Sequence, residues 1–162
     1  MPDDDPTVTD RIWSFADRMD PCMLVTQDGG QARVRPVFAR VRREEGRIYI
    51  LTDISGDKLG QIEACPQVAI AFSDARANDY VVIRGEAAIS RDQAKIDEVW
   101  RVSDETFWST PENPDLRLIT VTPSDAELWD GSHMLVAGVK VLAERLAGVK
   151  VQLVENARVE QI

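Results

Sequence analysis

The sequence contains few of the residues that build metal sites and disulfide frameworks. Its 162 residues include 2 cysteines and 1 histidine. Cys22 and Cys65 lie outside any Cys-x-x-Cys spacing, so a zinc site of the Cys/His type cannot be assembled and no metal site is expected. A Cys-His nucleophilic pair is poorly supported for the same reason. We expect reduced thiols and a cytoplasmic protein.

Long apolar runs are also absent. No stretch approaches the roughly 18 apolar residues of a membrane span, and the N-terminus lacks the basic region and apolar run of a signal peptide. We therefore expect no membrane partner. Hydrophobic residues make up 44% of the chain and charged residues 29%, which is typical of a globular protein. The length favours a single domain over residues 1–162.

The charge is acidic overall but unevenly distributed. There are 19 Lys and Arg against 28 Asp and Glu, a net charge of -9, which argues against nucleic acid as a partner. Residues 31–58 nevertheless carry a net charge of +3. The seven bases there are Arg33, Arg35, Arg40, Arg42, Arg43, Arg47 and Lys58. This segment either receives a small anion or alternates its charges along an exposed strand.

The hydrophobic pattern predicts an antiparallel β-barrel with flanking helices, a mainly β fold of the α+β class. Pro36 is expected at a sheet edge or a bulge, and Gly85 at a bulge. Thr7 with Asp10, and Ser90 with Gln93, have the spacing of helix capping boxes. Strands are predicted over residues 22–27, 31–43, 47–52, 67–73, 79–90, 116–122 and 126–129. Helices are predicted over residues 7–19, 57–64, 93–102 and 135–146.

The loop after the third strand contains the parts of a phosphate site. Between Leu51 and Lys58 the sequence places two hydroxyl side chains, a glycine and a lysine next to a helix N-terminus. Backbone N–H groups and a lysine at such a place favour an anion. The alternative is that Ser55 only caps the helix and that Lys58 is a solvated surface residue.

Six short segments, taken in order, resemble the pyridoxamine 5'-phosphate oxidase-like FMN-binding split-barrel superfamily, specifically its general stress proteins. The segments are Arg35-Pro36-Val37, the set Thr52, Ser55 and Lys58, Pro66-Gln67-Val68, residues 80–85, residues 94–100 and residues 127–131. The resemblance implies an antiparallel FMN-binding split β-barrel with FMN as the cofactor.

The resemblance also implies where the cofactor lies. The backbone of Arg35 to Val37 would run under the flavin ring, and Arg35 and Lys58 would meet the phosphate. Trp108 and Trp129 would close over the ring, although Trp129 equally suits a core position at a strand end. The complete implied cofactor-binding set is Arg35, Pro36, Val37, Leu51, Thr52, Asp53, Ser55, Lys58, Trp108 and Trp129.

Members of this family resemble one another in forming homodimers with the flavin at the subunit interface, so a homodimer is expected here. The alternative is a monomer with an ordinary aromatic core. One departure concerns the substrate: no arginine lies between Asp130 and Lys140, where true pyridoxamine 5'-phosphate oxidases hold the substrate phosphate. Oxidation of that compound is therefore not expected. His133 is either a proton donor near the flavin or a cap or surface residue.

The favoured function is an FMN-binding flavoprotein, an oxidoreductase that acts on an unidentified small organic substrate in a stress-related role. Two alternatives stay open. One is a non-catalytic flavin-binding stress protein or redox sensor. The other is a deazaflavin-dependent reductase, whose longer anionic coenzyme would need a more extended basic groove than this acidic chain offers.

Overall fold

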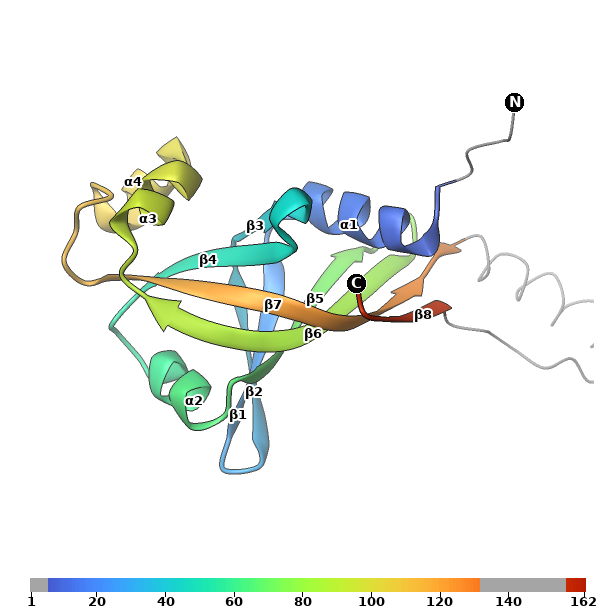
Figure 1. Ribbon diagram of the computed structural model, residues 1–162, viewed down its shortest axis with the longest axis horizontal. Helices are drawn as coiled ribbons and strands as arrows, with labels where there is room; N and C mark the ends of the chain where they lie inside the picture. Colours follow the sequence, from blue (N-terminus) through green and yellow to red (C-terminus); the bar gives the residue numbers. More distant parts are fainter. Residues whose placement is uncertain (1–5, 132–156) are drawn as a thin grey trace, which may run out of the picture.

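A computed structural model describes residues 6–131 and 157–162 (Figure 1). The strands are β1 (Cys22–Asp28), β2 (Gln31–Val37), β3 (Ala39–Arg42), β4 (Arg47–Asp53), β5 (Gln67–Asp74), β6 (Asp79–Ser90), β7 (Leu116–Trp129) and β8 (Ala157–Glu160). The helices are α1 (Val8–Arg18), α2 (Lys58–Ala64), α3 (Gln93–Val99) and α4 (Glu105–Trp108), with short 3-10 turns η1 (Arg43–Glu45) and η2 (Val102–Asp104). The helix predicted over residues 135–146 and His133 lie outside the described residues.

The strands form one antiparallel sheet in the order β2-β1-β5-β6-β7-β4-β3, and β8 pairs with the second half of β7. β2 and β3 follow each other in the chain but form the two edges of this order, so the sheet is not closed. This confirms the predicted split barrel. The prediction of a single strand over residues 31–43 is wrong. β2 pairs with β1 at one edge of the sheet and β3 pairs with β4 at the other, and the chain crosses between the two edges at Phe38.

β6 and β7 form the long central ladder, and a bulge lies between them. The register shifts between Arg84 and Gly85, and Gly85 lies opposite Pro123. A Cβ on Gly85 would lie 2.2 Å from the carbonyl oxygen of Thr122, so only glycine fits there. The bulge at Gly85 is confirmed. Because it accommodates Pro123, β7 continues from Leu116 to Trp129, and the prediction of two separate strands is wrong.

Pro36 lies on the edge strand β2, opposite Met23 of β1. This confirms the expected edge position, because proline has no N–H to give to a second neighbouring strand.

The main core fills the inside of the sheet and is closed at one end by α1. Thr7 and Asp10 form the predicted capping box, and the buried face of α1 presents Ile12 and Phe15 to the core. α1 contacts β3, β6, β7 and β8, whereas α2 contacts β1 and β6. Figure 1 shows the two helices at opposite ends of the molecule. None of the helices among the described residues is both long enough and apolar enough to span a membrane.

A second, smaller core lies between α3 and the neighbouring halves of β4 and β7. It contains Tyr49, Leu51, Ile96, Val99, Leu116 and Leu118. The cap of α3 is Asp92, whose carboxylate accepts from the backbone N–H of Lys95 at 3.1 Å. The prediction of a Ser90–Gln93 capping box is therefore wrong, and α3 ends at Val99, before the predicted end at residue 102. The sequence pattern did not predict α4 or β8.

Candidate functional site

Arg35 carries a positive charge into the junction of β2, β1 and α2. Its guanidinium donates to the hydroxyl of Thr26 at 3.0 Å and to the side-chain oxygen of Gln61 at 2.7 Å. The Thr26 hydroxyl in turn donates to Gln61 at 2.6 Å, and both of these residues are buried. Within the described part of the chain, no carboxylate pairs with Arg35. Its charge is therefore met by neutral oxygens alone.

Lys58 lies one helical turn before Gln61 on α2, so both side chains project on the same side of the helix. α2 therefore carries Lys58 on the side that meets Arg35. The Lys58 ammonium donates to the backbone oxygen of Ser55 at 2.7 Å. Ser55 does not cap α2: its N-cap residue is Asp57, which makes no side-chain cap bond. The capping alternative for Ser55 is thus wrong.

The carboxylate of Asp53 organises the loop between β4 and α2. It accepts from the backbone N–H of Ser55 at 2.8 Å, from the Ser55 hydroxyl, and from the indole N–H of Trp108 at 2.9 Å. Burial raises the pKa of Asp53, but the hydrogen bonds from Ser55 and Trp108 and the charge of Lys58 outweigh it and lower the pKa below its usual value. Asp53 is therefore ionised at neutral pH and ties this loop to α4.

Two segments of the predicted cofactor-binding set, Arg35 to Val37 and Leu51 to Asp53, each have a backbone edge that pairs with no other described strand. β2 pairs with β1 on one side only. In β4, pairing with β3 ends at Ile50, opposite Ala39, so Leu51, Thr52 and Asp53 pair only with β7 among the described strands. These two edges lie on either side of the opening of the split barrel. The sequence predicted the segments but not the reason for their open edges.

Trp129 is not brought to this end of the molecule. It pairs with Tyr80 near the end of β7, twelve residues after Arg117, which pairs with Thr52. At about 3.3 Å per strand residue, Trp129 lies roughly 40 Å from Arg117 along β7, so it is at the opposite end of this strand from Thr52. The site residues that lie with Thr52 at the other end of β7 are Leu51, Asp53, Ser55, Lys58 and Trp108. Pro36 of β2 lies in one row of the sheet with Met23, Ala71, Val82 and Glu127, two residues before Trp129.

Three bases of the basic segment are used in ion pairs. Arg33 pairs with Asp28, Arg43 with Asp10 and Arg40 with Asp104. These three bases are therefore balanced by carboxylates within the fold. The bases of this segment that remain closest to a candidate anion site are Arg35 and Lys58.

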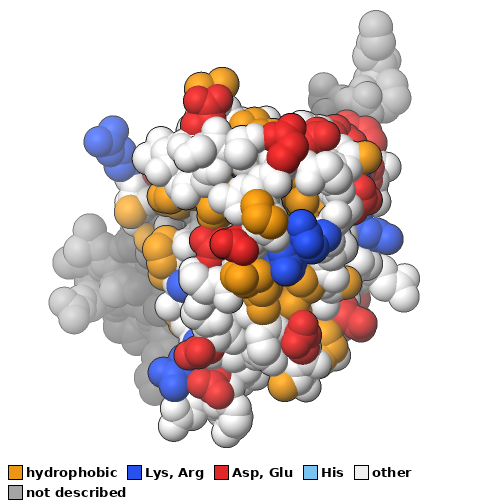
Figure 2. Space-filling view, turned by 90° about the vertical axis from the view of Figure 1, so that its left-hand side faces the viewer, with side chains coloured by type: hydrophobic (Ala, Val, Ile, Leu, Met, Phe, Trp, Pro, Cys, Tyr) orange, Lys and Arg blue, Asp and Glu red, His pale blue; other side chains and the backbone are white. Residues whose placement is uncertain are grey.

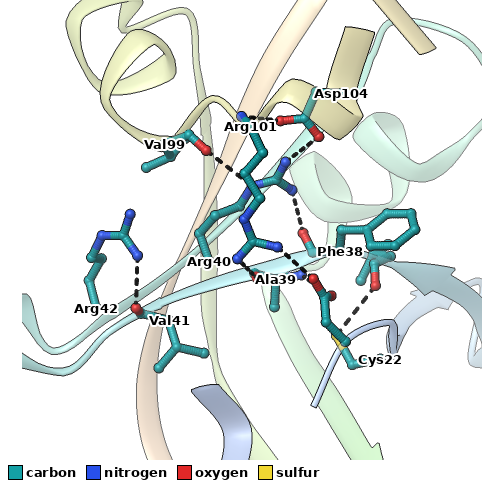
Figure 3. A network of polar contacts seen from close by, with 11 residues as sticks. Cys22, Phe38, Ala39, Arg40, Val41, Arg42, Val99, Arg101 and Asp104 are labelled. Carbon is teal, nitrogen blue, oxygen red and sulfur yellow. Dashed lines mark hydrogen bonds and ion pairs between the residues drawn. The ribbon is translucent and has the colours of Figure 1, made fainter. Parts of the chain in front are cut away.

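Arg40 is the most unexpected of these bases, because its side chain is 1% exposed. Its guanidinium contacts the Asp104 carboxylate, the backbone oxygen of Phe38 at 2.7 Å and that of Val99 at 3.3 Å (Figure 3). Asp104 also accepts from the backbone N–H of Arg101 at 2.7 Å. This buried pair fixes the start of β3 against the segment that leads into α4.

Sequence reasoning missed Thr26, Gln61, Arg40 and Asp104. Gln61 carried a usable signal, because its spacing of three from Lys58 places both on one helix face. Asp104 carried none, since it lies far from Arg40 in the sequence and meets it only in the folded chain.

Two pockets lie elsewhere on the surface. One, of about 430 Å³, is lined by residues of α1 and of the end of β7, including Asp10, Arg11 and Leu128. The other, of about 380 Å³, lies beside the Gly85 bulge. Neither is lined by any of the ten predicted site residues.

Solved structures with the same fold include several general stress proteins. A putative general stress protein 26 from Jannaschia sp. CCS1 has 23% identity and a TM-score of 0.68, over 94% of this chain and 98% of that chain. General stress protein 26 from Bacillus anthracis str. Sterne has 21% identity and a TM-score of 0.66, over 73% and 90%. The general stress FMN/FAD binding protein of Xanthomonas citri has 21% identity and a TM-score of 0.65, over 75% and 87%.

These identities show a shared fold, and the search of curated proteins finds no match. The family itself is shown by the sequence. The model of the family described as pyridoxamine 5'-phosphate oxidase like matches residues 7–152, which is most of the chain. The chain therefore belongs to the pyridoxamine 5'-phosphate oxidase-like family.

Proposed function

We propose that this protein binds FMN and that Arg35 and Lys58 hold the FMN phosphate. The observation that carries the proposal is the half-buried guanidinium of Arg35, which is met by the neutral oxygens of Thr26 and Gln61 alone. A phosphate monoester brings a charge of about −1.5 to −2 and three acceptor oxygens. Its charge would replace the missing counter-ion, and Lys58, on the Gln61 side of α2, would add a second charge-assisted contact.

The strand edges suit the flavin ring. The backbone of Arg35 to Val37 and that of Leu51 and Thr52 each pair with a single strand among the described residues, and on β2 Pro36 offers a C=O but no N–H. Backbone N–H and C=O groups match the polar edge of a flavin, which carries both donors and acceptors. Asp53 and Trp108 close the end of this edge through their hydrogen bond. Bound FMN supplies hydride or electron transfer, and these residues bind and orient it.

We also propose a homodimer formed through the outer face of the sheet. Pro36, Met23, Ala71 and Val82 lie side by side across β2, β1, β5 and β6, and Met23 is 38% exposed. A row of apolar side chains across four strands favours a covering partner. Because Pro36 belongs both to this face and to the predicted flavin segment, a second copy on this face would place the flavin at the interface.

This dimer also gives Trp129 a role. Its partner Tyr80 lies opposite Ser73 of β5, two residues after Ala71, so Trp129 belongs to the same outer face of the sheet. In a homodimer formed through this face, Trp129 would lie at the interface that holds the flavin. Light scattering should give the mass of a dimer, and Met23→Glu should shift it toward a monomer. A monomeric wild type with full flavin occupancy would contradict the shared site.

We propose an oxidoreductase activity on a small organic substrate in the cytoplasm. One observation supports the cytoplasmic setting: Cys22 and Cys65 are not joined in a disulfide. Steady-state turnover with reduced nicotinamide and candidate acceptors tests the activity against flavin storage or redox sensing. Mass spectrometry of the bound chromophore separates FMN from a deazaflavin coenzyme. We expect no oxidation of pyridoxamine 5'-phosphate.

The binding experiment compares FMN with riboflavin, which lacks the phosphate. We expect FMN to bind more tightly, and Lys58→Ala to weaken FMN binding by about 1.5–3 kcal/mol while riboflavin binding stays unchanged. Lys95→Ala is the matched control, because it removes the same charge from α3, where Lys95 pairs with Glu45 and Glu98. Equal affinity for FMN and riboflavin, or an equal loss in both variants, would refute the phosphate site.

A further inference from the structure

Three aromatic rings from two distant parts of the chain form a continuous strip on the surface, which we call the aromatic strip: Phe38, Phe107 and Trp108. The ring centroids of Phe38 and Phe107 are 6.0 Å apart, and those of Phe107 and Trp108 are 5.5 Å apart. Phe38 is 42% exposed and Phe107 is 57% exposed. Burying a large aromatic side chain is favourable in free energy, so an exposed strip of this kind points to a ligand or a partner.

The buried side chain of Arg40 holds the aromatic strip in place. The buried guanidinium of Arg40 donates to the backbone oxygen of Phe38 and pairs with Asp104, the residue immediately before α4. One side chain thereby fixes the backbone of Phe38 and the start of α4 against each other (Figure 3). At the other end, Trp108 donates to Asp53. A strip anchored at both ends is preorganised, which lowers the entropic cost of stacking a ligand on it.

The strip joins the two segments that we propose hold the flavin. Phe38 directly follows Val37, and Trp108 is bonded to Asp53, which directly follows Thr52. Figure 2 views the side of the molecule that carries α2, α3 and α4, and hydrophobic side chains gather there among charged ones. A compound stacked on Phe38 and Phe107 would therefore lie beside the flavin rather than at a remote place.

The charges around the strip argue against an anionic ligand. Arg40 is neutralised by Asp104, and Arg101, whose guanidinium donates to the backbone oxygen of Ala39, is neutralised by Asp20. Glu105 is exposed within α4 itself, two residues before Phe107. An anion on the strip would find neither of these two arginines available and would be repelled by Glu105.

We propose that the aromatic strip is the binding platform for the substrate of this flavoprotein, and that the substrate is an uncharged planar aromatic compound. The assignment as substrate rests on the proposed function; the ligand chemistry rests on the rings and charges of the strip. Ring stacking supplies the affinity, and the pairing of Arg40 and Arg101 with carboxylates, together with the charge of Glu105, supplies the selectivity against anions.

The test uses quinoline as an uncharged probe and quinoline-carboxylate as its anionic counterpart, measured by equilibrium dialysis with apo and FMN-saturated protein. We expect quinoline to bind both forms, and the carboxylate to bind at least several-fold more weakly. Phe107→Leu keeps an apolar side chain but removes the ring, and it should weaken quinoline binding about three- to tenfold. Phe107→Tyr should retain binding. Val102→Ala is the matched control, because Val102 is 80% exposed on η2 and belongs to no ring contact.

Three results would overturn the proposal. Equal quinoline binding by wild type and Phe107→Leu would show that the rings are not the platform. Displacement of quinoline by FMN would assign the strip to the flavin ring itself. Loss of dimer mass in Phe107→Leu, with quinoline binding unchanged, would assign the strip to a subunit contact. If FMN fails to bind at all, the proposed function falls, whereas ring-dependent binding of quinoline would still establish an aromatic site.

Discussion

Arg35 and Arg40 belong to the same basic segment of the sequence and end in opposite environments. Arg35, at the edge of the sheet, bonds to the neutral oxygens of Thr26 and Gln61. Arg40, on the next strand, is completely buried and pairs with Asp104. The first arginine brings a net charge to its surroundings, and the second brings none. Only the first is available to an anionic ligand.

This difference shows that a count of charged residues in a sequence segment does not tell which of them can bind an anionic ligand. A buried guanidinium without a carboxylate would be prohibitively costly, so the burial of Arg40 requires Asp104. Arg35 is half-buried, and water and neutral dipoles meet part of its charge. The same residue type therefore serves as a fixed structural link at one position and as a candidate binding group at the other.

The largest expected effect comes from breaking the buried pair. Arg40→Ala leaves the Asp104 carboxylate buried without its partner, and we expect a loss of about 3–5 kcal/mol in the free energy of unfolding. Urea unfolding measures it. The double variant Arg40→Met with Asp104→Leu removes both charges and should recover most of the loss. If the single variant unfolds like wild type, Asp104 has found another partner or water, and the pair is not a structural link.

For Arg35, at the edge of the sheet, we expect a large effect on FMN affinity and a small effect on stability. Arg35→Gln keeps a donor toward Thr26 but removes the charge, so FMN affinity should fall about 10- to 100-fold. Stability should change by less than about 1 kcal/mol, because no buried carboxylate is left behind. Titration with FMN and with riboflavin measures the first effect, and urea unfolding the second. A stability loss as large as that of Arg40→Ala, or an equal loss of riboflavin affinity, would contradict the comparison.

Much of the fold could be predicted from the sequence, because strand periodicity, turns and caps are local. The Thr7–Asp10 cap, the Gly85 bulge and the edge position of Pro36 all follow from nearby residues. The division of β2 and β3 at Phe38 could not be predicted. It depends on which strands lie on either side, and that is decided by pairings far along the chain.

In the candidate site, too, the features set by neighbouring residues could be predicted and the contacts between distant residues could not. The loop from Thr52 to Lys58 was predictable, since its residue types and spacing suffice to suggest an anion site. The partners of each base were not predictable, because Gln61, Thr26 and Asp104 meet the arginines only after folding. The position of Trp129 shows the same limit: its strand end was evident, but its distance from Thr52 depends on β7 being one continuous strand.

The smallest expected effect concerns Arg43, an exposed base of the same segment, which pairs with Asp10 at the surface. The hydrogen bond from Thr7 and that from Arg43 lower the pKa of Asp10 from 3.8 to about 2. Because the folded pKa lies below the unfolded value, this contribution to stability is fully present above about pH 4 and is lost as the pH falls toward 2. Asp10→Asn should therefore be slightly less stable than wild type at neutral pH.

The difference between wild type and Asp10→Asn should shrink as the pH falls through 4 toward 2 in urea unfolding measured at several pH values, and a small part should remain at pH 2, where the folded Asp10 is about half ionised. Arg43→Gln should show a smaller difference with the same pH dependence, since the Thr7 contact is retained and is the larger cause of the shift. It should also be far less destabilising than Arg40→Ala, because both partners of the surface pair stay hydrated when one is removed. A difference at pH 2 as large as that at neutral pH would mean that Asp10→Asn disturbs the packing of α1 rather than an ionised cap. An Arg43→Gln loss equal to that of Arg40→Ala would remove burial as the feature that separates these arginines.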